Sequence, residues 1–212
     1  MSSLAELVKR VSKQEHGFKL IEKEAEILVN ESGPTESYAV AMELFQSDKY
    51  QARSLAVFIL GRLAVNSSAA LQFLREEVNQ DESWQVQEIL AKAFDQYCKD
   101  SGYEKSLPVI KNWLADKNPN VKRAVTEGLR IWTGRPYFKD HPEVAVMLLA
   151  THKDDDSEYL RKSVGNALRD ISKKHAALVE AELATWDFSN KKIQLTYKLA
   201  SKFLDKETEK KK

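Results

Sequence analysis

A repeat with steps of 34, 36 and 39 residues limits this 212-residue chain to few folds. Four segments align when they are anchored on Tyr50, Trp84, Asn120 and Tyr159. Apolar residues recur in register after each anchor, at Leu55, Ile89, Val125 and Val164 and again at Ile59, Ala93, Leu129 and Leu168. Repeats of this length are typical of HEAT-like helix pairs, which cannot bury both apolar faces alone and therefore stack into a curved array with a concave surface.

Turn signals divide the chain into helix pairs. Glu-Ser-Gly-Pro at 31–34 and Ser-Gly at 101–102 end helices, and Pro34 suits the first position of the next helix. The expected helices cover residues 4–13, 18–30, 35–46, 50–65, 69–79, 83–99, 103–116, 120–132, 142–153, 157–174, 176–186 and 191–204. We therefore expect an all-α, curved solenoid of about six HEAT-like helix pairs, with the second helix of each pair on the concave face. An irregular helical bundle is the alternative.

Composition agrees with helices in a single domain. Hydrophobic residues make up 42% of the chain and charged residues 31%, with 7 Gly and 5 Pro. We expect one domain over residues 1–204, followed by a polar, disordered tail over 205–212. The single cysteine, Cys98, excludes a disulfide framework and a cysteine-based zinc site. With no signal peptide or membrane-spanning run expected, we predict a cytoplasmic monomer, nucleoid-associated if bacterial.

The net charge of +1 does not indicate a polyanionic partner, so any nucleic-acid footprint must come from the placement of charges. One column of the repeat is mostly basic, at Arg53, Gln87, Arg123 and Lys162, and the column before it contains Lys122 and Arg161. Cations spaced by a repeat can follow a phosphate backbone. The alternative is that they pair with the adjacent repeat, as charged residues of HEAT repeats often do.

Aromatic residues gather near the same helix starts. They are Tyr50, Trp84 and Tyr159, with Trp132 nearby. Aromatic faces can stack on bases or bind a cation. The alternative is that they cap the core at the turn between helices. Trp84 precedes the polar run Gln-Val-Gln-Glu, which favours a solvent-facing role for it.

Three acids interrupt this basic face. Glu88 follows Trp84 by four residues, and Glu127 follows Arg123 by four, so each acid lies on the same helix side as its neighbour. Asp170 lies two turns beyond Lys162, with Asn166 between them. These acids are either members of intrahelical ion pairs, worth a few tenths of a kcal/mol, or carboxylates held in a cationic groove for chemistry.

Three segments resemble the AlkC/AlkD superfamily of DNA alkylation repair glycosylases. Residues 118–130 end in Glu-Gly-Leu-Arg, similar to the Glu-Gly-x-Arg segment of AlkC-type proteins. Residues 159–175 resemble the longer AlkC pattern Arg-(Arg/Lys)-Ser-Val-x-Asn-x-Leu-x-Asp-Ile-x-Lys-x-His. Residues 83–88 resemble the Ser-Trp-x-x-x-Asp segment of AlkD-type proteins, with Glu88 in place of Asp. The resemblance extends from about Tyr38 to Trp186.

The resemblance implies excision of positively charged bases, such as 3-methyladenine and 7-methylguanine, from double-stranded DNA, without a metal or other cofactor. It implies that Glu127 and Asp170 are active-site acids, with Glu88 near a further acid. Arg123 matches a phosphate-facing arginine, and Trp84 matches an active-site tryptophan. We expect Arg53, Arg161 and Lys162 to bind phosphates as well, and Trp132 and Asn166 to contact the substrate.

Two positions depart from the family pattern. Asn166 stands where AlkD-type proteins have a second tryptophan, and Trp132 lies near, but not at, the tryptophan that follows Glu-Gly-x-Arg in AlkC-type proteins.

The residue types suit the implied reaction. A purine alkylated at N3 or N7 is cationic and departs as a neutral base, so no general acid is needed to protonate it. Positive charge then develops on the deoxyribose, where a carboxylate can stabilise it and orient the attacking water. Two other classes remain open: a non-catalytic DNA-binding relative and a HEAT scaffold that binds proteins.

Overall fold

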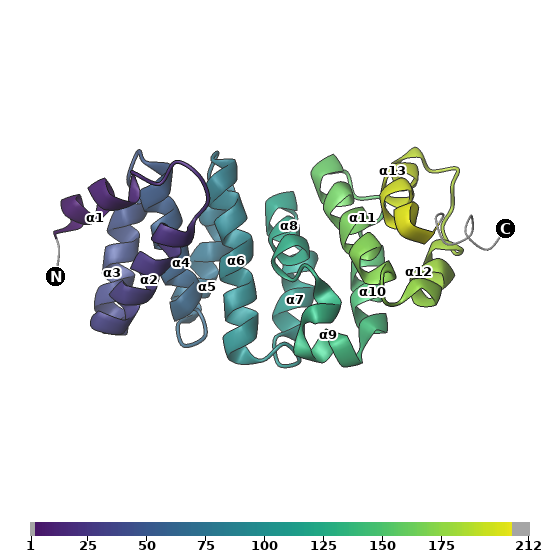
Figure 1. Ribbon diagram of the computed structural model, residues 1–212, viewed down its shortest axis with the longest axis horizontal. Helices are drawn as coiled ribbons and strands as arrows, with labels where there is room; N and C mark the ends of the chain where they lie inside the picture. Colours follow the sequence, from purple (N-terminus) through teal and green to yellow (C-terminus); the bar gives the residue numbers. More distant parts are fainter. Residues whose placement is uncertain (1–2, 205–212) are drawn as a thin grey trace. The chain divides into compact units, whose positions relative to one another are not determined.

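The computed structural model describes residues 3–204, and these residues form helices and turns with no β-strand (Figure 1). The prediction of an all-α fold built from helix pairs is confirmed. The predicted tail, 205–212, lies outside the described residues. The described residues fall into two compact units, which divide between Ser101 and Gly102. The single domain, the curvature and the concave face stay predictions.

The first unit is built around one buried helix. In chain order its helices are α1 (Leu4–Val11), α2 (Lys19–Glu31), α3 (Pro34–Phe45), α4 (Tyr50–Leu63), α5 (Ser68–Glu76), the 3₁₀ turn η1 (Val78–Gln80) and α6 (Trp84–Ser101). Helix α4 is apolar nearly all round, and it packs against α2, α3, α5 and α6. A helix that is hydrophobic on every side belongs in the interior of a stack, which is where the repeat register places it.

The second unit is centred on α11 in the same way. Its elements are α7 (Leu107–Leu114), α8 (Pro119–Gly128), η2 (Trp132–Gly134), α9 (Pro136–Asp140), α10 (Pro142–Ala150), α11 (Glu158–Ser172), α12 (Ala176–Leu183), α13 (Lys191–Ala200) and η3 (Ser201–Phe203). Helix α11 packs against α8, α10, α12 and α13. This packing brings together the segments 118–130 and 159–175.

Helix starts follow the expected capping chemistry. Pro34, Pro119 and Pro142 each occupy the first turn of a helix, where a missing backbone N–H costs nothing. The side chain of Ser157 accepts a hydrogen bond from the Leu160 amide and caps α11. Within residues 3–204, no helix has the length and apolar character needed to cross a membrane.

Close helix packing makes two glycines sensitive to substitution. A methyl group at Gly61 of α4 would lie 2.7 Å from Cα and Cβ of Ala93 on α6, and one at Gly165 of α11 would lie 2.7 Å from Cβ of Leu199 on α13. We expect Gly61→Ala to destabilise the protein by about 1–3 kcal/mol, because the backbones of α4 and α6 must move apart to admit the methyl group. Thermal unfolding checks this, and Gly33→Ala is the control, since its added methyl group meets nothing within 4 Å. Equal melting temperatures for the two variants would contradict the close packing.

Candidate functional site

Two predicted acids meet between α8 and α11 in the second unit. Arg130, just after α8, connects them: its Nε donates to Asp170 Oδ2 at 3.0 Å, and its Nη1 donates to Glu127 Oε2 at 3.4 Å. Glu127 also accepts a hydrogen bond from the hydroxyl of Ser163 on α11, at 2.5 Å. The two helices therefore share one continuous polar network.

Asp170 is the buried end of this network, with its side chain 7% exposed. Besides Arg130, it accepts from Lys173 Nζ at 3.0 Å and from Arg169 Nη2 at 3.4 Å. Burial raises the pKa of the Asp170 carboxyl, but the hydrogen bonds from Lys173 and Arg130 and the guanidinium charges outweigh burial and hold its pKa below the ordinary value. Asp170 is thus an ionised carboxylate that three cations surround.

Arg130 responds in the opposite direction. Burial lowers the pKa of its guanidinium, but the hydrogen bond to Asp170 and the charges of Glu127 and Asp170 together raise it by more, so the net pKa is above the ordinary value. The side chain stays cationic and holds the two acids at fixed positions. An arginine suits this place because its planar donors can serve two carboxylates at once.

Glu127 is the more accessible of the two acids, with its side chain 23% exposed. It lies one turn beyond Arg123 on α8, so both residues are on the same side of the helix. Within residues 3–204, the Arg123 guanidinium forms no recorded ion pair, and its side chain is only half-buried. A carboxylate and a cation without an acidic partner are therefore next to each other on one helix face.

Helix α11 extends this face. Lys162, Asn166 and Asp170 follow at intervals of four residues, which places them along one side of the helix. Lys162 is exposed, pairs with Glu158 at 2.6 Å and lies over the Tyr159 ring, and the hydrogen bond with Glu158 raises its pKa. Since both partners of this ion pair are exposed, Lys162 can exchange Glu158 for a phosphate at small cost. Asn166 is half-buried.

Two basic residues predicted to bind phosphates bind partners within the protein. Arg53 of α4 forms a two-pronged pair with Asp81, at 2.6 and 3.1 Å, and donates its remaining edge to the Ser47 carbonyl. Arg161 donates to the carbonyls of Asp155 and Asp156. Both guanidiniums are held by partners in their own unit, and their predicted phosphate contacts stay predictions. For Arg53 the structure supports the alternative of pairing between repeats.

Lys122 repeats the pattern of Arg53 in the second unit. It pairs with Asp155 at 2.5 Å, across the step from α8 to the turn before α11. Burial raises the pKa of Asp155, but the hydrogen bonds from Lys122 and the Ser157 amide and the charge of Lys122 together outweigh burial, so the net pKa is below the ordinary value. In both units, then, an aspartate just before a helix pairs with a cation of an earlier helix: Asp81 before α6 pairs with Arg53 of α4, and Asp155 before α11 pairs with Lys122 of α8.

The two tryptophans predicted to contact substrate differ in burial. Trp132 is completely buried: its indole N–H donates to the Thr126 carbonyl, and its ring packs edge-on against Phe138. The predicted substrate contact of Trp132 is therefore corrected to a core position, because no face of the indole reaches solvent. Trp84, at the start of α6, is 67% exposed, which agrees with the predicted solvent-facing role. Glu88, one turn further along α6, is also exposed.

Sequence reasoning missed Arg130, Ser163 and Lys173. Arg130 and Ser163 lie inside the two quoted family segments, and Lys173 follows Asp170 by three residues. A search for a cation within one turn of each acid would have found Arg130 and Lys173. Within residues 3–204, no group of three His, Cys, Asp or Glu side chains is placed to hold a metal ion.

Comparison with solved structures finds close likenesses of nearly the whole chain. AlkD2 from Streptococcus mutans is 49% identical, with a TM-score of 0.91, over 95% of this chain and 99% of that one. The protein smu.31 from S. mutans UA159 is 48% identical with a TM-score of 0.89 over the same shares. The Pseudomonas fluorescens alkylpurine DNA glycosylase AlkC, solved with DNA containing an abasic site analogue, is 24% identical with a TM-score of 0.52, over 95% of this chain and 62% of AlkC. The AlkC likeness shows the fold alone.

Sequence comparison gives the family. The uncharacterised protein YhaZ of Bacillus subtilis is 36% identical over 87 residues, a match that spans 39% of this chain and 24% of YhaZ. A profile of the family described as DNA alkylation repair enzyme matches residues 19–204, from the start of α2 to the end of the described chain. With so much of the chain matched, and with AlkD2 alike over nearly the whole of both chains, this protein belongs to the DNA alkylation repair enzyme family.

Proposed function

We propose that this protein binds double-stranded DNA and removes positively charged alkylated purines, such as 3-methyladenine and 7-methylguanine, by hydrolysis of the N-glycosidic bond. One observation carries the proposal. Glu127 is a partly exposed carboxylate next to Arg123, a cation with no recorded acidic partner in residues 3–204. Membership of the DNA alkylation repair enzyme family supports it.

Glu127 has the chemistry that the reaction needs. As the bond to a cationic base breaks, the base departs neutral and positive charge develops on the sugar. A carboxylate held by Ser163 and Arg130 is already oriented and loses little free energy by reorganising during the reaction. The same oxygen can orient the water that attacks the anomeric carbon.

Asp170 has a different part in this proposal. Its three cations and its burial leave little room for a sugar, so it acts through Arg130, whose position it fixes. Asp170 is then a positioning residue and Glu127 the acid that contacts the reacting sugar. Glu88, Trp84 and Asn166 remain candidates for contacts to the substrate.

The test is incubation with DNA methylated at purine N3 and N7. We expect release of the free methylated bases, detected by chromatography, and no release of unmodified purines. Failure to release any methylated base at saturating protein would contradict the proposed activity.

A second candidate is a DNA-binding protein without glycosylase activity. The Arg130 network favours it, because one cation shared by Glu127 and Asp170 weakens the field of both carboxylates. In this case the protein binds methylated DNA and leaves every base in place. The incubation described above separates the two functions when it is combined with a binding assay.

Arg123 and Lys162 give a prediction for binding. We expect Arg123→Ala and Lys162→Ala each to weaken binding to all duplexes about equally, and to reduce the slope of log affinity against log salt by about one unit. Fluorescence anisotropy over a salt series measures both quantities. Lys111→Ala, an exposed cation on α7 outside the basic column, is the control. Unchanged binding in the double variant would show that DNA contacts another surface.

A further inference from the structure

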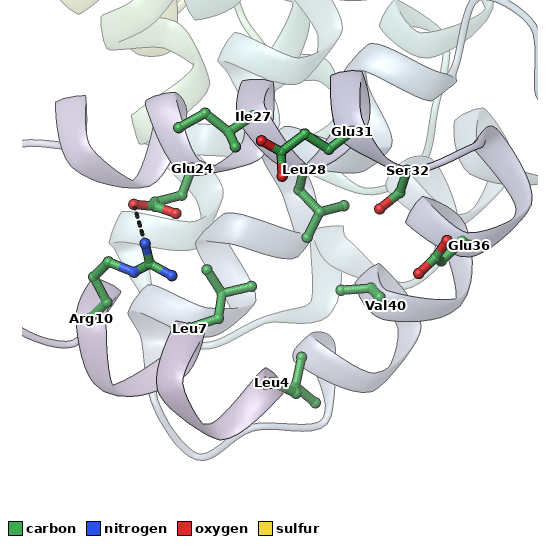
Figure 2. A pocket seen from close by; sticks show the side chains of 10 residues that line it. All are labelled: Leu4, Leu7, Arg10, Glu24, Ile27, Leu28, Glu31, Ser32, Glu36 and Val40. Atoms are coloured by element: carbon green, nitrogen blue, oxygen red, sulfur yellow. Dashed lines mark ion pairs between the residues drawn. The ribbon is translucent and has the colours of Figure 1, made fainter. Parts of the chain in front are cut away.

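A cavity of about 540 Å³ lies among α1, α2 and α3, and residues of the first unit line it (Figure 2). None of the residues assigned above to DNA chemistry is among them. Its apolar lining consists of Leu4, Leu7, Ile27, Leu28 and Val40. This volume is within the range of pockets that bind small molecules, which combine apolar walls with a few polar groups.

The polar groups of this cavity are mostly acidic. The lining holds three carboxylates, the buried Glu24 and the exposed Glu31 and Glu36, and one cation, Arg10, which gives it a formal charge of −2. Figure 2 shows the Arg10–Glu24 pair at one end of the cavity and Ser32 with Glu36 at the other. A ligand that complements this lining is therefore cationic.

Glu24 is the least expected residue in this position. Its side chain is only 10% exposed, and its recorded ion pair within residues 3–204 is at 3.4 Å, to an Arg10 side chain that is 44% exposed. A well-formed charged hydrogen bond is shorter, about 2.7–2.9 Å. Burying a carboxylate with one long contact destabilises a helix interface, and an apolar residue would pack there at lower cost. The second oxygen of Glu24 can accept a further cation.

The spacing along α2 sets the shape of the ligand. Glu24, Ile27, Leu28 and Glu31 are at positions i, i+3, i+4 and i+7, so they lie along one side of the helix. Two carboxylates are thereby about 10 Å apart along the axis, with apolar side chains between them. This pattern matches a molecule with an ammonium group at each end of an aliphatic chain.

We propose that the cavity binds a linear aliphatic diamine, with one ammonium at Glu24 and the other at Glu31 and Glu36. The alkyl chain lies over Ile27 and Leu28 of α2 and against Leu7 of α1. The Arg10 guanidinium keeps one oxygen of Glu24 and leaves the other for the ligand. This binding does not depend on the proposed glycosylase activity, since no residue is shared.

The test compares three probes of equal chain length on the full chain by calorimetry: hexamethylenediamine, hexylamine and hexanol. We expect the diamine to bind about threefold or more tightly than the monoamine, because its second ammonium pairs with the exposed carboxylates of Glu31 and Glu36, and exposed ion pairs add only modestly to affinity. Hexanol is expected not to bind detectably. The diamine should also shift the methyl NMR signals of Ile27, Leu28 and Leu7. Equal affinity of the diamine and the monoamine, or unshifted methyl signals, would overturn the proposal.

Matched variants locate the site. Glu24→Gln combined with Glu31→Gln keeps side-chain size and is expected to weaken diamine binding about tenfold or more. Glu22→Gln, on the same helix but outside the cavity lining, removes one charge and is expected to leave the affinity unchanged. An equal loss of diamine affinity in the double variant and in Glu22→Gln would show that the diamine is attracted by the overall negative charge and not bound in the cavity. A helical peptide with two lysines that binds more tightly than hexamethylenediamine would overturn the small-molecule assignment.

Discussion

Glu127→Gln is expected to lower single-turnover excision of a cationic alkylpurine by on the order of a hundredfold or more, while affinity for DNA holds or rises. Gln keeps the side-chain length and can still accept the Ser163 hydrogen bond, so the variant removes charge and little else. The negative charge stabilises the sugar only as the glycosidic bond breaks, and therefore the rate falls. In the ground state the same charge repels phosphates, so its removal does not weaken binding.

The measurement is rapid-quench release of methylated base under single-turnover conditions, with anisotropy on the same duplex. Glu143→Gln, an exposed glutamate of α10 in the same unit, controls for net charge and should retain full activity. A fully active Glu127→Gln would remove Glu127 from the reaction. If the parent protein binds methylated DNA but releases no base, the non-catalytic function holds.

Helix positions could be predicted from the sequence because the register depends on local chemistry. The apolar positions of α4 and α11 recur at helical spacing, and Pro34 and Pro142 mark helix starts. Three segments differed most from the prediction, and the first is 129–132, which lies beyond the end of α8 at Gly128. Residues 103–106 form turns before α7, and 136–140 form the short α9. None of the three has a strong helical period of its own, and tertiary packing decides its conformation.

The polar site was predicted in part. Spacing of four residues placed Glu127 with Arg123 and aligned Asn166 with Asp170, since a helix fixes such neighbours. The spacing could not show which cations would form ion pairs with acids from other helices. The partner of Arg53 is Asp81, 28 residues later, and the partner of Arg130 is Asp170, 40 residues later. Such contacts depend on how helices stack, which no local pattern encodes.

The two tryptophans show the same limit. Trp84 and Trp132 were both grouped with the aromatic residues near the aligned helix starts and compared with tryptophans of the family pattern, so both were candidates for substrate contact. The chain after α8 turns inward, and Trp132 enters the core against Phe138. An indole can hydrogen-bond to a buried carbonyl and pack on all sides, so its residue type alone does not reveal its exposure.

Asp170→Asn is expected to destabilise the protein by about 3 kcal/mol at pH 7, the lower end of the range for removing one member of a buried ion pair. The lower end applies because Arg130 and Lys173 are partly exposed and regain some hydration. Asn keeps the shape but leaves Arg130, Arg169 and Lys173 without their shared carboxylate. Thermal unfolding should show a fall in Tm of several degrees. Asp140→Asn, an exposed aspartate of the same unit, should stay within about 0.5 kcal/mol of the parent.

The effect of Asp170→Asn should depend on pH in one direction. Because the pKa of Asp170 is lower in the folded protein than in the unfolded chain, its carboxylate stabilises the fold above the unfolded value of about 3.9. That stabilisation is lost as the pH falls through the folded pKa, whereas Asn does not titrate. The Tm difference between parent and variant should therefore be largest near neutral pH and shrink below about pH 4. An unchanged Tm at pH 7 together with a hundredfold loss of excision would instead make Asp170 the catalytic acid.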